Sequence, residues 1–267
     1  MEKISVVTIS FNCKSLIEDT IKSVINQTYN KIEYIIIDGA SKDGTVDVIT
    51  KYKSSIDVVI SEPDNGIYDA MNKGIKAASG DWIIFMNAGD SFYKNTVIEE
   101  FVEKINSDTI IAHGDIMYYA KYYKYINKPC EIEEMKHKMA VKHQATFTKL
   151  EYHKKHLFDS SFRSAGDYDF FYKAYFIDNV KFQYIPIVVA NFDGSGTSNS
   201  NFWLSRKEDY KIWNKENDFF YLLKDNIILR SWSFKRWIKS HFMNETSIKE
   251  IERKNIMKQG FTPIEIK

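Results

Sequence analysis

Acidic and amide side chains stand just after several apolar, β-branched runs of this sequence. Asp38 ends one such run, Asp64 and Asn65 follow the next, and Asp90 follows a third. Parallel strands of an open α/β sheet bind ligands beyond their carboxyl ends, so these side chains are expected to line one crevice. Carboxylates there can accept hydrogen bonds from a base or ribose, or hold a divalent cation against phosphate groups.

Each of these acids also has a simpler explanation. Asp43, Asp64 and Asp90 stand before helical patterns, where an aspartate commonly caps the free N–H groups of a helix. Capping accounts for any one of them. It is a weaker explanation for acids that recur at consecutive strand ends.

The first 90 residues alternate between strand and helix patterns, and this predicts how the acids are positioned. Short β-branched runs alternate with stretches whose apolar residues recur at helical spacing. The expected strands are 4–9, 32–37, 57–60 and 82–86, and the expected helices are 15–28, 45–52 and 67–78. Repeated strand–helix units predict an α/β fold with a mostly parallel sheet and helices on both faces.

Beyond residue 100 the pattern changes. A strand is expected at 109–112, a tyrosine-rich hairpin at 116–126, a helix at 167–177 and a last strand at 181–192. Antiparallel additions to the parallel sheet explain this order.

Composition limits the classes of function. The chain has 267 residues and a net charge of only +1, so no general basic field indicates a nucleic-acid partner. Cys13 and Cys130 are too few for a disulfide framework or a zinc site, which predicts reduced thiols and a cytoplasmic protein. No signal-peptide pattern and no membrane-spanning run is found in the sequence.

Several ordered motifs resemble those of a known family. The runs I-S-V-V-T-I-S-F-N, I-I-I-D-G-A-S-K-D-G-T, S-E-P-D-N-G-I-Y-D-A-M-N-K-G and G-D-W-I-I-F-M-N-A-G-D occur in this order. H-Q-A-T-F at 143–147 and R-S-A-G-D-Y-D-F-F-Y-K-A at 163–174 follow. This order and spacing resembles a family 2 glycosyltransferase of the GT-A fold, of the bacterial polysaccharide-biosynthesis type. The resemblance implies a GT-A domain over 1–200, with a nucleotide-sugar half at about 1–110 and an acceptor half at about 111–200.

The resemblance also implies a nucleotide-sugar donor site. Its residues would line the nucleotide pocket, contact the base or ribose, and complete the site around the diphosphate. They are Thr8, Ser10, Asn12, Asp38, Asp64, Asn65, Lys73 and Asn87.

The metal motif departs from the family pattern. Family members carry D-x-D after the fourth strand, but here Asn87 and Gly89 replace the two aspartates, and Asp90 keeps the only charge. Mg²⁺ or Mn²⁺ can be held by one carboxylate with diphosphate oxygens and waters. Asp90 is therefore expected to ligate the cation, with His143 either as a further ligand or as a hydrogen-bonded histidine of the acceptor site.

Asp167 is the implied general base. In the family, an aspartate before a Tyr/Trp-Asp pair takes the proton of the acceptor hydroxyl, and this chain reads Asp167-Tyr168-Asp169. The alternatives are that Asp169 is the base, or that Asp167 only stabilises a helix N-terminus. Asp193 and the segment 195–198 are expected to form a loop over the donor.

The segment 201–267 is expected to be a helical extension of basic and aromatic character. It holds fourteen Lys/Arg against nine Asp/Glu, and Trp232, Phe234 and Trp237 interleave with basic residues. Such a helix suits a membrane interface and a lipid-linked acceptor. Alternatively, it packs its aromatic residues on the core or on a second subunit in a homo-oligomer.

Together these features predict an inverting glycosyltransferase that uses a UDP-sugar and a glycan or lipid-linked acceptor. The expected location is the cytoplasm or the inner face of its membrane. A sugar nucleotidyltransferase is the enzymatic alternative, but the basic, glycine-rich phosphate loop of those enzymes is absent from the N-terminal sequence. A non-catalytic nucleotide-sugar-binding or scaffold subunit is the other alternative, favoured only by the altered metal motif.

Overall fold

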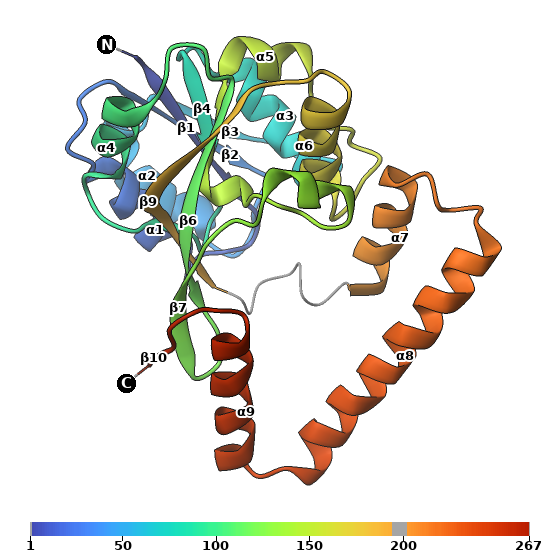
Figure 1. Ribbon diagram of the computed structural model, residues 1–267. Coiled ribbons are helices and arrows are strands. Elements are labelled where there is room, and N and C mark those ends of the chain that lie inside the picture. Colours follow the sequence, from blue (N-terminus) through green and yellow to red (C-terminus); the bar gives the residue numbers. More distant parts are fainter. Residues whose placement is uncertain (1, 194–201, 267) are drawn as a thin grey trace.

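The computed structural model describes residues 2–193 and 202–266. Its first half is built of parallel strands joined by helices (Figure 1). The elements in chain order are β1 (Ile4–Ser10), α1 (Ile17–Ile25), β2 (Ile32–Asp38), α2 (Thr45–Lys51), β3 (Val58–Ser61), α3 (Ile67–Ala77) and β4 (Trp82–Phe85). The strands lie in the order β4-β1-β2-β3, all parallel, and Ser10 pairs with Asp38 at one end. The predicted parallel α/β half is confirmed.

The second half adds mainly antiparallel strands to the β4 edge. Its elements are β5 (Ser91–Phe92), α4 (Val97–Lys104), β6 (Ile111–Tyr119), β7 (Tyr123–Asn127), β8 (Thr146–Lys149), α5 (Leu150–Lys155), α6 (Gly166–Phe176) and β9 (Phe182–Asp193), with short 3₁₀ turns at Lys53–Ser55, Ile132–Lys136 and His143–Ala145. The sheet continues from β4 through β8 to β6 and β7, while β9 runs parallel to β6.

Two expectations for this half need correction. The strand expected at 109–112 and the first arm of the hairpin at 116–126 are one continuous strand, β6. Residues from Ile111 to Met117 are all buried, and this includes His113, Gly114 and Asp115, which interrupt the apolar pattern in the sequence. The strand β8 was not predicted. Its four residues carry two threonines that alternate with Phe147 and Lys149, a pattern too short to separate from a loop.

Helices cover both faces of the sheet. On one face, Ile4, Val6 and Ile36 pack with residues of α1, α2 and α4, while on the other, Val7 and Ile35 pack with residues of α3, α5 and α6. This alternation along β1 and β2 follows from the two-residue period of a strand, with both faces buried as in other parallel sheets.

The C-terminal segment forms three helices and returns to the sheet. These are α7 (Phe202–Ile212), α8 (Phe219–Phe242) and α9 (Glu245–Lys258), followed by β10 (Ile264–Glu265), which pairs with β7. In Figure 1, α7 lies beside α6, α8 runs apart from the sheet, and α9 lies beside β7. In the two described ranges, every helix lacks the combination of length and apolar character needed to cross a membrane.

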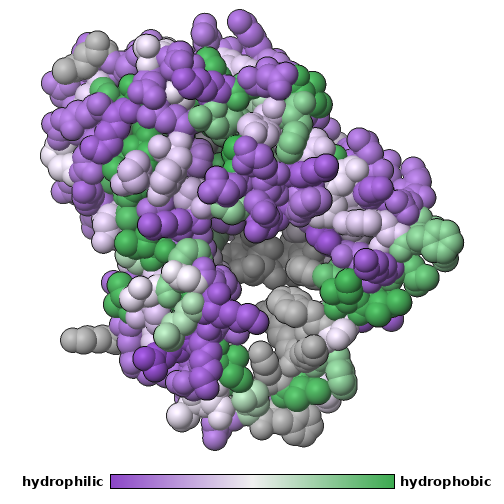
Figure 2. All heavy atoms as spheres, in the orientation of Figure 1, coloured by the Kyte–Doolittle hydropathy of each residue, from purple (hydrophilic) through white to green (hydrophobic). Residues whose placement is uncertain are grey.

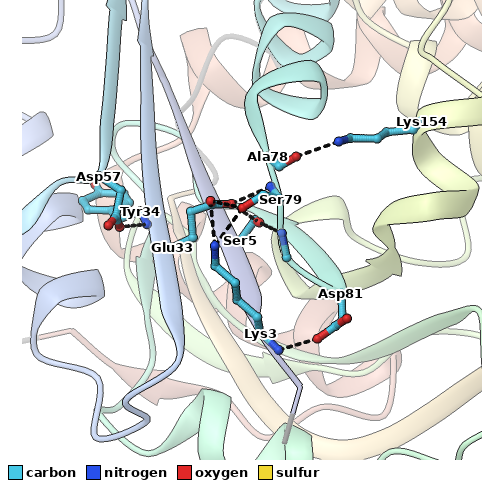
Figure 3. Close-up of polar contacts among 10 residues, drawn as sticks. Lys3, Ser5, Glu33, Tyr34, Asp57, Ala78, Ser79, Asp81 and Lys154 are labelled. Carbon is cyan, nitrogen blue, oxygen red and sulfur yellow. Dashed lines mark hydrogen bonds and ion pairs between the residues drawn. The ribbon is translucent and has the colours of Figure 1, made fainter.

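A buried carboxylate ties together the sheet end opposite the sequence motifs that follow the strands. Glu33 of β2 accepts hydrogen bonds from Ser5 Oγ (2.6 Å), Ser79 N (2.7 Å) and Lys3 Nζ (2.9 Å), as Figure 3 shows. It joins the starts of β1 and β2 to the α3–β4 connection. The Glu33 carboxylate and its hydrogen bonds therefore stabilise this end of the sheet.

Candidate active site

The ends of β1, β2 and β3 meet at the carboxylate of Asp38. This side chain is fully buried and accepts hydrogen bonds from Ser10 Oγ (3.1 Å), Ser41 N (2.9 Å) and Ser61 Oγ (2.7 Å). The carboxylate thus fixes the positions of the loops after β1, β2 and β3 relative to one another. Its oxygens face protein serines, so a base or ribose would meet the loops that Asp38 organises.

Phe11, Gly39 and Asp64 form the open part of this edge. A Cβ atom on Gly39 would lie 2.5 Å from Asp64 Oδ2 and 3.0 Å from the ring of Phe11, so only glycine lets the two side chains approach each other here. Phe11 is 64% exposed, and its ring and the Asp64 carboxylate both lie against Gly39. The sequence did not single out Phe11, although it stands within the first motif. Next to it, Asn12 adopts a left-handed backbone (φ 47°) and accepts from Lys42 N.

The simpler capping explanation is not confirmed for Asp43 and Asp64, because Gly44 and Gly66 are the N-cap residues of α2 and α3 and neither helix has a side-chain cap. The two carboxylates instead stabilise the turns that lead into these helices. Asp43 Oδ1 accepts from Thr45 N (3.0 Å) at the start of α2, and Asp64 Oδ1 accepts from Gly66 N (2.9 Å) before α3. In Asp64 the second oxygen remains turned toward Gly39. Asp64 therefore shapes the turn and faces the open edge at once.

Two expected donor residues lie elsewhere. Thr8 is fully buried within β1, where its hydroxyl contacts Tyr34 Oη (3.1 Å) on the face shared with Val6, so it does not line this edge. Lys73 binds Glu62 (2.9 Å) and donates to the carbonyl of Pro63 (2.7 Å). Its ammonium therefore fixes the loop that carries Asp64.

Asn65 is exposed, and the structure ties its backbone to two neighbours. Its N–H donates to Asp69 Oδ2 (2.9 Å) in α3, and its carbonyl accepts from the guanidinium of Arg163. Arg163 precedes α6, so this contact joins the expected donor loop to the segment that carries Asp167.

A hydrogen-bonded network surrounds Asp167. One carboxylate oxygen contacts His143 Nδ1 (2.8 Å) and the other accepts from Tyr68 Oη (3.0 Å), while His143 Nε2 contacts the amide Nδ2 of Asn87 (3.2 Å). These four residues come from separate motifs of the sequence. Tyr68 was missed, because nothing near it in sequence indicates a partner in α6.

The network keeps Asp167 ionised. Burial alone would raise its pKa, but hydrogen bonds from His143, Tyr68 and the N–H of Tyr168 outweigh burial and hold the pKa below its ordinary value. Burial raises the pKa of Tyr68, which keeps this phenol a donor. A neutral His143 fits the same geometry, since its Nδ1–H donates to the carboxylate and its Nε2 accepts from Asn87.

The geometry separates Asp167 from Asp169. Asp169 is buried and its carboxylate binds Lys173 Nζ (2.7 Å), one helical turn later in α6. Asp167 instead lines a cavity of about 280 Å³ together with His143, Ser205, Arg206 and Asp209. Asp167 thus lines the cavity, whereas the carboxylate of Asp169 is held in an ion pair with Lys173.

Helix α7 completes the wall of the cavity and holds the start of α6. The carboxylate of Glu208 accepts from the backbone N–H groups of Arg163 (2.7 Å), Ser164 (2.9 Å) and Ala165 (2.8 Å), directly before α6. The site therefore draws on residues from both sides of the boundary expected near residue 200. Asp209 lies beside Arg206 (3.5 Å), and burial raises its pKa to about 6 despite this neighbour.

The residues of the altered metal motif offer few ligands. Oδ1 of Asn87 is buried without a hydrogen-bond partner among the described residues, so it is an oxygen available to a cation or a donor hydroxyl. His143 uses both ring nitrogens within the network. Where the structure describes the chain, no three His, Cys, Asp or Glu residues gather into a metal cluster. This donor set fits a cation that takes most of its ligands from diphosphate and water.

The loop expected over the donor begins at the end of β9. Asp193 ends β9, and the segment 195–198 lies outside the described residues.

Comparison with known proteins gives the family. The family model described as glycosyl transferase family 2 matches residues 5–176. The chain belongs to glycosyl transferase family 2. The match begins one residue into the first motif and contains all the later motifs from which the sequence suggested this family, Asp167 included.

Curated relatives match different lengths of the chain. The uncharacterized glycosyltransferase Rv1514c of Mycobacterium tuberculosis is 42% identical over 39% of this chain and 40% of its own length. A PGL/p-HBAD biosynthesis glycosyltransferase of Mycobacterium bovis is 23% identical over 72% of this chain and 77% of its own. The putative teichuronic acid biosynthesis glycosyltransferase TuaG of Bacillus subtilis is 37% identical over 34% of this chain and 38% of its own. The chain thus spans about 40% of the length of the first curated relatives that it matches.

Solved structures show the fold. S. aureus TarS in complex with UDP-GlcNAc superimposes with a TM-score of 0.64 over 79% of this chain and 64% of that chain, at 15% identity. The mannosyltransferase PcManGT from Pyrobaculum calidifontis, in complex with GDP-Man and Mn²⁺, gives 0.59 over 76% and 59%, at 14% identity. The GT-A fold expected for this family 2 member is confirmed.

Proposed function

We propose that this family 2 protein is an inverting glycosyltransferase that moves a sugar from a nucleotide diphosphate donor to a hydroxyl of a glycan acceptor. The observation that carries the proposal is the ionised carboxylate of Asp167, held by His143 and Tyr68 at the wall of a cavity. This is the arrangement that deprotonation of an acceptor hydroxyl requires.

The reaction follows from the placement of this base. The acceptor hydroxyl enters the cavity and donates its proton to Asp167 as its oxygen bonds to the anomeric carbon. The bond from that carbon to the diphosphate oxygen breaks on the opposite face, which inverts the configuration. His143 orients the carboxylate through its Nδ1–H, and Asn87 fixes the ring by donating to Nε2.

The donor is proposed to lie along the ends of β1 to β4. Phe11 and Asp64 would face the nucleoside, Ser10, Asn12 and Asp38 would shape its loops, and Asn87 Oδ1 with Asp90 would hold Mg²⁺ or Mn²⁺. When bound, such a cation neutralises charge on the departing diphosphate. UDP-GlcNAc in TarS, and GDP-Man with Mn²⁺ in PcManGT, support a nucleotide-sugar donor with a divalent cation, and a UDP-sugar is our preferred donor.

The acceptor is proposed to be a glycan of the bacterial cell surface, either free or linked to a lipid at the inner face of the membrane. Support comes from the printed roles of the relatives in PGL/p-HBAD and teichuronic acid biosynthesis. A second cavity of about 480 Å³ shares Lys138 and Lys142 with the first and adds Lys128. These lysines suit an acceptor that carries phosphate or carboxylate groups.

Two experiments test the proposal. Thermal unfolding with UDP-, GDP-, CMP- and dTDP-sugars, each with and without Mn²⁺, should give a shift for one nucleotide that grows with the metal. No shift with any nucleotide would contradict the donor site and favour a scaffold.

The second experiment measures release of nucleotide diphosphate with the donor so identified. Asp167→Asn should lower kcat by about 10² to 10⁴ and keep the donor-induced thermal shift. Asp169→Asn is the matched control and should stay within about tenfold of the unsubstituted enzyme. Full activity in Asp167→Asn would rule out this base.

A further inference from the structure

Helix α8 presents an apolar stripe to solvent. Phe220 is 80% exposed, Phe219 68% and Ile227 62%, which is far more than core residues of similar size. At about 100° per residue, these and four further exposed side chains fall within one arc of roughly 100°. The α8 stripe consists of Phe219, Phe220, Leu223, Ile227, Phe234, Trp237 and Ile238. Figure 2 shows apolar side chains gathered at the right of the view, where α8 begins.

The opposite side of α8 is fixed to α7. Asp225 binds Arg206 through Nε and Nη2 (both 2.8 Å) and accepts from Tyr210 Oη (2.5 Å). Arg206 also lines the cavity beside Asp167. The stripe therefore faces away from the protein on a helix whose other side contacts a wall of the candidate active site.

The charge of α8 is strongly positive. Its sequence has five basic residues and a single acid, Asp225, whose carboxylate is already paired with Arg206. Arg230 is exposed and falls within the arc of the stripe, between Ile227 and Phe234. An apolar face with aromatic residues and an uncompensated positive charge is the composition of a helix that lies in an anionic membrane interface.

We propose that the α8 stripe docks this protein on an anionic membrane and so holds the cavity near the lipid surface. The inference rests on the proposed function, and it selects a lipid-linked acceptor over a free one. The aromatic and aliphatic side chains enter the boundary between headgroups and acyl chains. Arg230 reaches the phosphates of the headgroups along its own aliphatic stem.

A second copy of the chain is a poorer occupant of the same stripe. Phe220, Leu223, Ile227, Phe234 and Trp237 follow a three-and-four spacing that also suits a helix–helix seam. Such a seam would bury Arg230 at its centre. The only acid of α8 is bound by Arg206, so this guanidinium would lack a partner from either helix.

Flotation with lipid vesicles tests the docking. The full chain should float at low salt with vesicles of equal parts phosphatidylglycerol and phosphatidylcholine, and much less with phosphatidylcholine alone. The double variant Phe220→Ser, Ile227→Ser should lower the coefficient for partitioning into these vesicles at least about tenfold. Both side chains are largely exposed in the free protein, so the substitutions remove apolar surface that the membrane would otherwise bury. Arg230→Gln should weaken binding to the anionic vesicles only, and added salt should do the same.

Ile177→Ser is the matched control. Ile177 is 64% exposed, much like Ile227, but it ends α6 on another part of the surface, so flotation should not change. Absence of flotation at low salt would overturn the proposal, as would equal losses in Ile177→Ser and Ile227→Ser. A dimer measured by light scattering that becomes monomeric in Ile227→Ser would also overturn it and assign the stripe to a second copy.

The outcome is separable from that of the proposed function. Nucleotide-sugar thermal shifts of the Phe220→Ser, Ile227→Ser variant should equal those of the unsubstituted chain. If vesicles fail to bind while these shifts persist, docking alone is wrong. If no nucleotide shifts the unfolding temperature while flotation depends on the stripe, the donor assignment is wrong and the membrane surface stands.

Discussion

Replacing Glu33 with glutamine tests how strongly the far end of the sheet depends on one charge. Burial opposes ionisation of this carboxylate, but hydrogen bonds from Ser5, Ser79 and Lys3 outweigh it and lower its pKa from 4.5 to about 2. That difference corresponds to a contribution of about 3 kcal/mol to the free energy of unfolding at neutral pH. Glu33→Gln keeps the shape of the side chain and removes the charge, so it should lose most of this contribution.

The pH dependence gives the sharper test. A carboxylate with a lowered pKa contributes its full stability above pH 4.5 and loses it as the pH falls toward 2. Urea unfolding should therefore give a constant difference between Glu33→Gln and the unsubstituted chain from about pH 7 to about pH 5, which narrows only at lower pH. Glu103→Gln, at an exposed position of α4, is the control and should change stability by less than about 0.5 kcal/mol. A difference for Glu33→Gln below about 1 kcal/mol at neutral pH, or one that closes above pH 5, would refute this reasoning.

Three further predictions concern the site and the core. Burial raises the pKa of Asp209 from an ordinary 3.8 to about 6, so the free energy of unfolding should fall as the pH rises from about 4 to about 6. Asp209→Asn should therefore raise the unfolding temperature at pH 7 and not at pH 4, and an equal gain at both pH values would contradict this prediction. Burial lowers the pKa of His113 to about 4, so about 3 kcal/mol of stability should be lost as the pH falls from 6.5 to 4, and urea unfolding of His113→Leu should lack this component. Gly39→Ala would place a Cβ 2.5 Å from Asp64 Oδ2 and should weaken donor binding at least about tenfold in a calorimetric titration; unchanged donor affinity would contradict it.

Local periodicity was enough to predict the parallel half of the sheet and the edge where its loops meet. Each strand–helix unit contains its own signal, and the right-handed crossover then fixes where the strand ends lie. Thr8 was misplaced because β1 is buried on both faces, so alternation could not show that Thr8 points into the core with Tyr34.

The network around Asp167 depends on contacts that no local pattern encodes. Tyr68 and Asp167 are 99 residues apart in sequence, and Glu208 approaches the start of α6 from a segment that composition set apart as an extension. Individual motif residues could be named from the sequence. Their hydrogen bonds, which pair Asp169 with Lys173 and join Asp167 to His143 and Tyr68, required the folded chain.

The C-terminal segment 202–266 contacts the rest of the molecule in two separate regions. Glu208 of α7 binds the backbone before α6, and β10 pairs with β7 after α9. Between these anchors, α8 has one side in solvent and few contacts to lose. Its amide hydrogens should therefore exchange through a local opening that leaves both anchors intact, well before those of β1 and β2. Helix α8 can thus open locally while the contacts of Glu208 and the pairing of β10 with β7 persist.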